Sequence, residues 1–69
     1  MTKYEAVVIE ALANSRLSGR EAARRLNYHH NTIYYHVKNI LKETGLDPRD
    51  FHDMVKLYPM AKEVLEHEH

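Results

Sequence analysis

Apolar residues recur at helical spacing along almost the whole 69-residue chain. They stand three and four positions apart, which predicts amphipathic helices, and no stretch alternates apolar and polar residues as half-buried strands do. Glycine and proline, which end or interrupt helices, occupy four positions: Gly19, Gly45, Pro48 and Pro59. We therefore expect an all-α fold, a compact bundle of four or five short helices that forms a single domain over residues 1–69.

The first predicted helix runs from about Lys3 to Ala13. A capping-box pattern marks its start: Thr2 would accept a backbone hydrogen bond, and Glu5, three residues later, would accept one in return. The residues expected on its inward face are Tyr4, Val8, Ala11 and Leu12, with Val7 and Ile9 beside them. Residues 14–16 are expected to form a loop.

The second helix is predicted to be short, from about Gly19 to Leu26. Ser18 and Glu21 repeat the capping-box spacing at its start. Asn27 tolerates the left-handed backbone conformation that ends many helices, so we expect the helix to stop there. Its face of small and apolar side chains, which lets another helix approach closely, consists of Ala22, Ala23 and Leu26.

A third helix follows within two residues, with His29 as its expected N-cap. Residues 18–44 then have the layout of a helix-turn-helix motif. The inward side of the third helix is predicted to consist of Ile33, Val37, Ile40 and Leu41. Gly45 follows the end of this pattern, and we expect a Schellman motif there, with an apolar contact between Leu41 and Leu46.

The C-terminal part is predicted to form a helical extension over residues 47–65, followed by a frayed end at residues 66–69. Asp47 would cap this helix, and Pro48 would take its first position. Its apolar face is expected to consist of Phe51, Met54, Val55 and Tyr58. Pro59 either kinks this helix or opens a fifth one, and the sequence alone leaves both arrangements open.

The formal net charge of the chain is zero, but its charges are unevenly distributed. Residues 16–42 contain six arginine and lysine side chains against Glu21 alone, a net charge of +5. Over residues 43–69, seven acidic residues outnumber three basic ones. Because the local charge rather than the total attracts a phosphate backbone, the basic middle of the chain favours nucleic acid as its partner.

In a helix-turn-helix, the second helix lies in the major groove of duplex DNA, and its N-terminal residues meet the base edges. The polar side of the third predicted helix fits this role, since asparagine pairs with adenine, and lysine with guanine or phosphate. We expect base contacts from His30, Asn31, Tyr34 and Lys38. We expect phosphate contacts from Arg16, Ser18, Arg20, Thr32 and Lys42. Tyr35 is predicted either to contact DNA or to pack inward.

The residues from Glu21 to Gly45, EAARRLNYHHNTIYYHVKNILKETG, also carry a family pattern. Ala-Ala-x-x-Leu, then His-x-Asn-Thr with an apolar residue, and later Thr-Gly-Leu-Asp resemble the C-terminal helix-turn-helix domain of PucR-type and sugar-diacid transcription regulators. The matching residues are Ala22, Ala23, Leu26, His29, Asn31, Thr32, Ile33, Tyr35 and Thr44–Asp47. Fis-type helix-turn-helix domains are similar more distantly, because they lack the Thr-Gly-Leu-Asp ending. The resemblance implies binding of double-stranded DNA.

Two positions depart from this family pattern. The arginine that follows the tyrosine in the family is His36 here, and histidine would contact phosphate more weakly and with pH dependence. Pro59 interrupts a segment that is usually helical. Family members carry this domain behind a long sensory region, whereas this chain begins at Met1. We therefore expect a small stand-alone transcription regulator in the cytoplasm, with a homodimer on a two-fold DNA site as its expected form.

Other functional classes have less support in the sequence. There is no Ser-His-Asp pattern, glycine-rich phosphate loop or apolar run of membrane-span length. His29, His30 and His36 lack the further ligands that zinc needs. We expect no enzymatic activity, cofactor, metal or small-molecule substrate. Two alternatives stay open: a protein-interaction or adaptor module with the same fold, and an accessory factor of DNA packaging or recombination.

Overall fold

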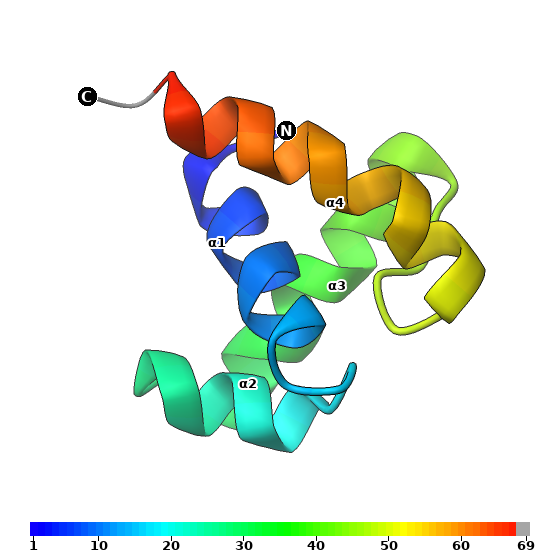
Figure 1. Ribbon diagram of the computed structural model, residues 1–69. Coiled ribbons are helices and arrows are strands. Elements are labelled where there is room, and N and C mark those ends of the chain that lie inside the picture. Colours follow the sequence, from blue (N-terminus) through cyan, green and yellow to red (C-terminus); the bar gives the residue numbers. More distant parts are fainter. Residues whose placement is uncertain (68–69) are drawn as a thin grey trace.

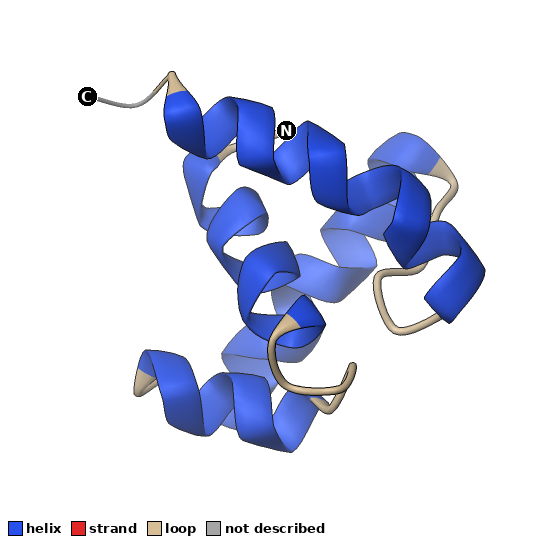
Figure 2. Cartoon of the chain, viewed as in Figure 1, coloured by secondary structure: helices blue, strands red, loops and turns tan. Residues whose placement is uncertain are grey.

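Each helix begins where a side chain accepts a hydrogen bond from a backbone N–H of the first turn, a group that has no partner inside the helix. A computed structural model describes residues 1–67, which form four helices and no strand (Figures 1 and 2). The helices are α1 (Lys3–Ala13), α2 (Gly19–Leu26), α3 (His30–Thr44) and α4 (Phe51–Glu66). The predicted all-α fold class is confirmed, with four helices rather than five in this part of the chain.

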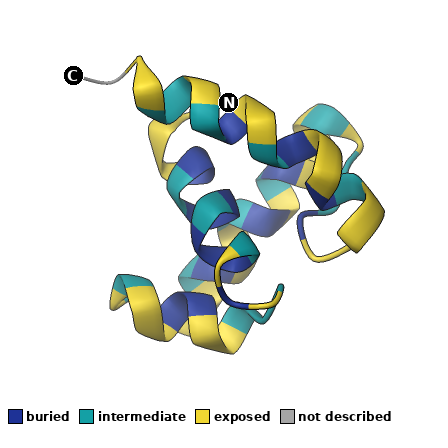
Figure 3. Ribbon diagram, viewed as in Figure 1, coloured by how far each residue is buried: buried dark blue, intermediate teal, exposed yellow. Residues whose placement is uncertain are grey.

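α1 packs against the three other helices, with α4 lying along it and α2 and α3 forming a second pair (Figure 1). The buried positions of the helices turn toward the middle of the molecule, as Figure 3 shows. Large side chains of the core that are at least 98% buried come from α1, α3 and α4: Val8, Ile9, Leu12, Ile33, Val37, Ile40 and Leu57. Because α4 packs on α1 and not on α2 or α3, the outer surface of the α2–α3 pair is open to solvent.

The start of α1 is the predicted capping box. The Thr2 hydroxyl accepts a hydrogen bond from the Glu5 N–H (3.1 Å), and the Glu5 carboxylate accepts one from the Thr2 N–H (2.8 Å). The predicted inward face is wrong at one position, because Tyr4 is 63% exposed, whereas Ile9 is fully buried. α1 is covered by several helices, so its buried arc is wide and reaches Ile9, while Tyr4 lies at its uncovered N-terminal edge.

α2 keeps only half of its predicted capping box. The Ser18 hydroxyl accepts a hydrogen bond from the Glu21 N–H (3.2 Å). The Glu21 carboxylate does not accept one in return, because it pairs with the Arg24 guanidinium one turn later (3.2 Å). The helix therefore starts at the predicted residue with one cap interaction instead of two.

The turn between α2 and α3 is a Schellman motif. Asn27 takes the predicted left-handed conformation, with a φ of 57°. The Tyr28 N–H donates to the Ala23 carbonyl (2.8 Å), and the Asn27 N–H donates to the Arg24 carbonyl (3.2 Å). These bonds fix the angle at which the chain leaves α2 and enters α3.

α3 begins at the predicted N-cap, since Nδ1 of His29 accepts a hydrogen bond from the Asn31 N–H (3.1 Å). Its inward stripe of Ile33, Val37 and Ile40 is confirmed, with each residue at most 2% exposed. Leu41 was also expected inside, but it is 41% exposed. The reason is that α4 packs on α1 rather than on α3, so this flank of α3 stays uncovered.

The end of α3 differs from the predicted Schellman motif. Gly45 has a φ of 76°, and its N–H donates to the Leu41 carbonyl (2.8 Å), which is the single bond of the simpler αL motif. The Leu46 N–H does not reach back to Leu41, because it donates to the Thr44 hydroxyl (3.1 Å). That hydroxyl in turn donates to the Ile40 carbonyl (2.7 Å).

α4 begins three residues later than predicted. Its N-cap is Asp50, whose carboxylate accepts a hydrogen bond from the Asp53 N–H (3.0 Å). Asp47 was the expected cap, but its carboxylate accepts from the Arg49 N–H (2.8 Å) and organises a separate turn. Asp50 closes this turn by donating its N–H to the Asp47 carbonyl (3.0 Å).

The buried side of α4 consists of Met54, Leu57 and Ala61. Two residues of the predicted face point elsewhere, since Phe51 is 65% and Val55 is 58% exposed. The sequence of α4 contains two overlapping apolar stripes, and α4 packs on α1 through the second of them. Lys62 reinforces this contact with an ion pair to Glu10 of α1 (3.2 Å).

Pro59 lies inside α4, which continues past it, so the fifth-helix alternative is wrong. Proline removes one backbone donor, and Pro59 lies at an exposed position, where the unpaired carbonyl one turn earlier can bond to water. α4 ends at Glu66, with His67 as its C-cap. The rest of the predicted frayed end, residues 68–69, lies outside the described residues.

Candidate nucleic-acid interface

The two opposite sides of α3 have different chemistry. On the side away from the core, exposed residues recur at spacings of four, three and four: Asn31, Tyr35, Lys38 and Lys42. With 3.6 residues per turn, these four side chains form one row, which we call the polar row. The polar row offers amide, phenol and ammonium groups, which base edges and phosphates can bind. Tyr35 is 63% exposed, so the predicted alternative of inward packing is wrong.

His30 and Tyr34 flank the polar row on one side, in the first turns of α3. Their rings meet edge to face, with centroids 5.5 Å apart, and Tyr34 is 47% exposed. Thr32 lies on the other flank and is half-buried. Six of the seven predicted DNA contacts on α3 are thus exposed at or beside the polar row, whereas Thr32 is half-buried.

The N-terminus of α2 lies close to the first turns of α3. A Cβ atom placed on Gly19 would lie 3.8 Å from Cγ2 of Ile33, which is ordinary van der Waals contact. Arg20 is exposed, and its side chain has no hydrogen bond or ion pair with any other group of residues 1–67. The predicted contacts Ser18 and Arg20 therefore stand beside the first turns of α3, with Arg20 available to an anion.

The structure separates Arg16 from this group. Arg16 lies in the α1–α2 loop, with a φ of 57°, and lines a different hollow together with Phe51 and Tyr58 of α4. Arg25 holds the same loop, because its guanidinium donates to the Asn14 carbonyl (3.2 Å) and to the Ser15 hydroxyl (3.3 Å). The +5 charge of the middle segment therefore does not all face one surface.

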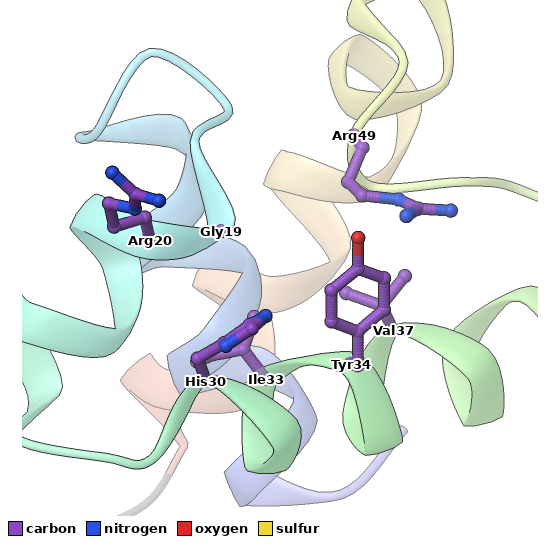
Figure 4. Close-up of a pocket in the computed structure, with 7 residues that line it drawn as sticks. All are labelled: Gly19, Arg20, His30, Ile33, Tyr34, Val37 and Arg49. Atoms are coloured by element: carbon purple, nitrogen blue, oxygen red, sulfur yellow. The ribbon is translucent and has the colours of Figure 1, made fainter.

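Figure 4 shows a hollow between α2, α3 and the turn that precedes α4. It has a volume of about 300 Å³ and is lined by Gly19, Arg20, His30, Ile33, Tyr34, Val37 and Arg49. Arg49 is the residue that the sequence analysis missed, since it belongs to the acidic C-terminal part of the chain. Its guanidinium carbon lies 5.3 Å from the centre of the Tyr34 ring, within cation–π range.

Asp47 holds the Arg49 side chain in place. Nε and Nη2 of Arg49 each donate a hydrogen bond of 3.2 Å to a different oxygen of the Asp47 carboxylate. These hydrogen bonds hold the pKa of Asp47 below its ordinary value of 3.8, and they raise the pKa of Arg49 further above its own. The pair is therefore fully charged at neutral pH. In the sequence, Gly45 and Pro48 signal a turn here, but nothing indicates which helix Arg49 would reach.

Two further observations concern metals and membranes. Within residues 1–67, no group of three histidine, cysteine, aspartate or glutamate side chains lies close enough to hold a metal ion. Among the helices described, none combines the length and the apolar character that crossing a membrane requires.

Comparison with known proteins gives the chain a family. The model of the PucR C-terminal helix-turn-helix domain matches residues 7–61, a segment that begins within α1 and ends within α4. Searches of curated proteins and of solved structures gave no match. The matched segment contains the whole helix-turn-helix and most of the chain, so this protein belongs to the PucR C-terminal helix-turn-helix family.

Proposed function

We propose that this protein binds specific sequences of duplex DNA and regulates transcription, with α3 as the recognition helix in the major groove. The observation that carries the proposal is the polar row of α3, which lies opposite a fully buried apolar stripe in a helix-turn-helix of a DNA-binding family. The buried stripe fixes how α3 is rotated, and this rotation presents the polar row outward.

The residues divide into two roles. Asn31, Tyr35 and Lys38, with His30 and Tyr34 beside them, lie within the first nine residues of α3 and would read base edges. Lys42 lies about 16 Å further along α3 than Asn31, given a rise of ~1.5 Å per residue, and would meet a phosphate at the edge of the groove. Phosphate contacts would also come from Ser18, Arg20 and Thr32, whereas Arg16 lines a different hollow and stands apart from this set.

We further propose that the chain acts as one domain and as a homodimer on a two-fold site in the cytoplasm. One recognition helix reads only a short half-site, and helix-turn-helix proteins gain affinity by pairing two of them. Phe51 and Val55 are large apolar side chains exposed on α4, a helix that packs on α1 and not on α3. A second copy that covers them would shield apolar surface from water. Sedimentation at several protein concentrations tests this, because a mass that stays monomeric would contradict it.

The alternative of a protein-interaction module draws on the same exposed Phe51 and Val55. An accessory factor of DNA packaging or recombination would share the DNA contacts and would differ in the target site. Salt dependence separates the first alternative from DNA binding, because phosphate contacts weaken steeply as salt rises. Enzymatic activity is not part of the proposal, since the helix-turn-helix family is typically non-enzymatic.

Fluorescence anisotropy with labelled duplex DNA tests the proposal. Selection from a random duplex pool should enrich one sequence, which binds about 10³-fold or more tightly than unselected DNA. Lys38→Ala should weaken binding to this sequence, whereas Lys56→Ala, on exposed α4 surface, should not. Binding that is absent even at low salt would contradict the proposed function.

A further inference from the structure

The hollow of Figure 4 brings together three segments that lie apart in the sequence: the first turn of α2, the first two turns of α3 and the α3–α4 turn. Ile33 and Val37 are buried and form its apolar wall. The four polar lining residues are all exposed, so the hollow is accessible from solvent: Arg20, His30, Tyr34 and Arg49. Its shape is therefore a recess on the surface that presents the polar row.

The charged side chains that line the hollow are both cationic. Arg20 stands on one side and Arg49 on the other, with Tyr34 and His30 rising from α3 between them (Figure 4). No carboxylate lines the hollow, and the Asp47 carboxylate binds Arg49 from within the turn. Guanidinium groups bind phosphate oxygens with charge-assisted hydrogen bonds, so this lining suits a phosphate group.

Arg49 is oriented before any ligand binds. The Asp47 carboxylate accepts hydrogen bonds from Nε and Nη2 of Arg49. Asp47 is itself held in place, because its N–H donates a hydrogen bond to the Asp53 carboxylate (2.9 Å). The remaining terminal nitrogen, Nη1, carries two more N–H groups. An arginine that is already ordered loses little conformational freedom when it binds an anion. Arg20 is the complementary case, because its side chain has no bonded partner within residues 1–67 and can turn toward an incoming group.

We propose that this hollow seats one backbone phosphate of the bound duplex, with Arg20 and Arg49 as its cationic contacts and the Tyr34 hydroxyl as a donor from the recognition helix. The proposal rests on the proposed function and extends the DNA interface beyond the helix-turn-helix to the turn before α4. Tyr34 lies three and four positions from Asn31 and Lys38, so it neighbours both on the surface of α3. A DNA strand that borders the groove would therefore pass the hollow when the polar row faces the bases.

The test uses Arg49→Gln and Arg20→Gln with a matched control, Lys56→Gln, which removes one positive charge from exposed α4 surface outside the hollow. Affinity for a short random-sequence duplex is measured from roughly 50 to 200 mM salt, and melting temperature is measured for each variant. The slope of log affinity against log salt is negative, and each phosphate contact that is lost should make it less steep by about 0.9. The gap in affinity between the wild type and each hollow variant should then shrink by about 3.5-fold across this salt range.

The expected result is that both hollow variants show this less steep slope, while Lys56→Gln keeps the wild-type slope. Slopes of Arg20→Gln and Arg49→Gln that equal that of the control would overturn the proposal and leave the Asp47–Arg49 pair as a purely structural contact. If Arg49→Gln melts too early to measure, Arg20→Gln decides, because Arg20 makes no side-chain bond within residues 1–67 and its replacement removes no such contact. Wild-type protein that binds no DNA would instead refute the proposed function, so the two failures are distinguishable.

Discussion

The α1–α4 pair and the α2–α3 pair differ in what their side chains do. α1 and α4 meet through fully buried apolar residues such as Leu12 and Leu57, and their outer surfaces carry none of the proposed base contacts. α2 and α3 also contribute buried residues, such as Ala22 and Ile33, and they carry the polar row and the N-terminus of α2 on the outside. The first pair mainly stabilises the fold, and the second presents the proposed DNA-binding surface.

This difference means that folding stability and DNA affinity can be changed separately. A substitution in the α1–α4 contact should lower stability and leave the affinity of the folded molecules unchanged. A substitution in the polar row should do the reverse, because exposed side chains contribute little to stability.

The largest expected effect is that of Leu57→Ala, which leaves a cavity where α4 packs on α1. Leu57 is fully buried, so the loss should be about 2–5 kcal/mol of unfolding free energy, measured by urea denaturation. Val55→Ala is the control, because Val55 is 58% exposed and its truncation should change stability by less than ~0.5 kcal/mol. Equal losses for the two variants would mean that the buried side of α4 has been misassigned.

Asn31→Ala should have the next largest effect, on the other pair of helices. The loss of its base contact should cost about 1–3 kcal/mol of binding free energy on the selected site. Its melting temperature should stay close to the wild-type value, because the Asn31 side chain is exposed. A large drop in melting temperature with unchanged affinity would show that Asn31 is structural.

Ser18→Ala and Thr2→Ala compare the same chemistry in the two pairs. Each removes the hydroxyl that caps a helix, at α2 and α1 respectively, so each should lower stability by about 1 kcal/mol in thermal unfolding. Affinity for DNA, measured on folded protein, should fall only for Ser18→Ala, since the N-terminus of α2 lies beside the polar row. A similar loss of affinity for Thr2→Ala would break the distinction between the pairs.

The smallest expected effect is the pH dependence of Asp47. Its pKa in the folded protein lies below the ordinary value of 3.8, so the charged pair with Arg49 stabilises the fold above that pH. This contribution is lost as the pH falls through the lowered pKa. The difference in melting temperature between the wild type and Asp47→Asn should be constant from neutral pH to about pH 5 and should vanish in stronger acid. A difference that grows in acid would contradict the assigned direction.

Local signals in the sequence were enough to predict the bounds of α1, α2 and α3 and, apart from Leu41, the inward stripe of α3. Thr2, Ser18 and His29 cap the three helices, and Asn27 and Gly45 take the left-handed conformation that ends a helix. The apolar residues of α3 form one dominant stripe, which defines the polar row on the opposite side.

The start and the buried side of α4 could not be predicted, because the sequence offers two suitable N-caps and two apolar stripes. Asp47 and Asp50 are both suitable N-caps, and the choice depends on Arg49, which engages the Asp47 carboxylate. The choice between the two apolar stripes of α4 depends on the shape of α1. Arg49 was missed for the same reason, since only the turn at residues 45–50 brings it to Tyr34 of α3.

The measurement that tests the central claim most directly is an NMR titration of labelled protein with random-sequence duplex DNA at low salt. We predict chemical-shift changes concentrated at residues 18–20, at the polar row of α3 and at Arg49, with the buried α1–α4 contact little affected. Added salt should reverse these shifts, because phosphate contacts release counterions. An absence of shifts, or shifts confined to the exposed Phe51 and Val55 side of α4, would contradict DNA binding through α3.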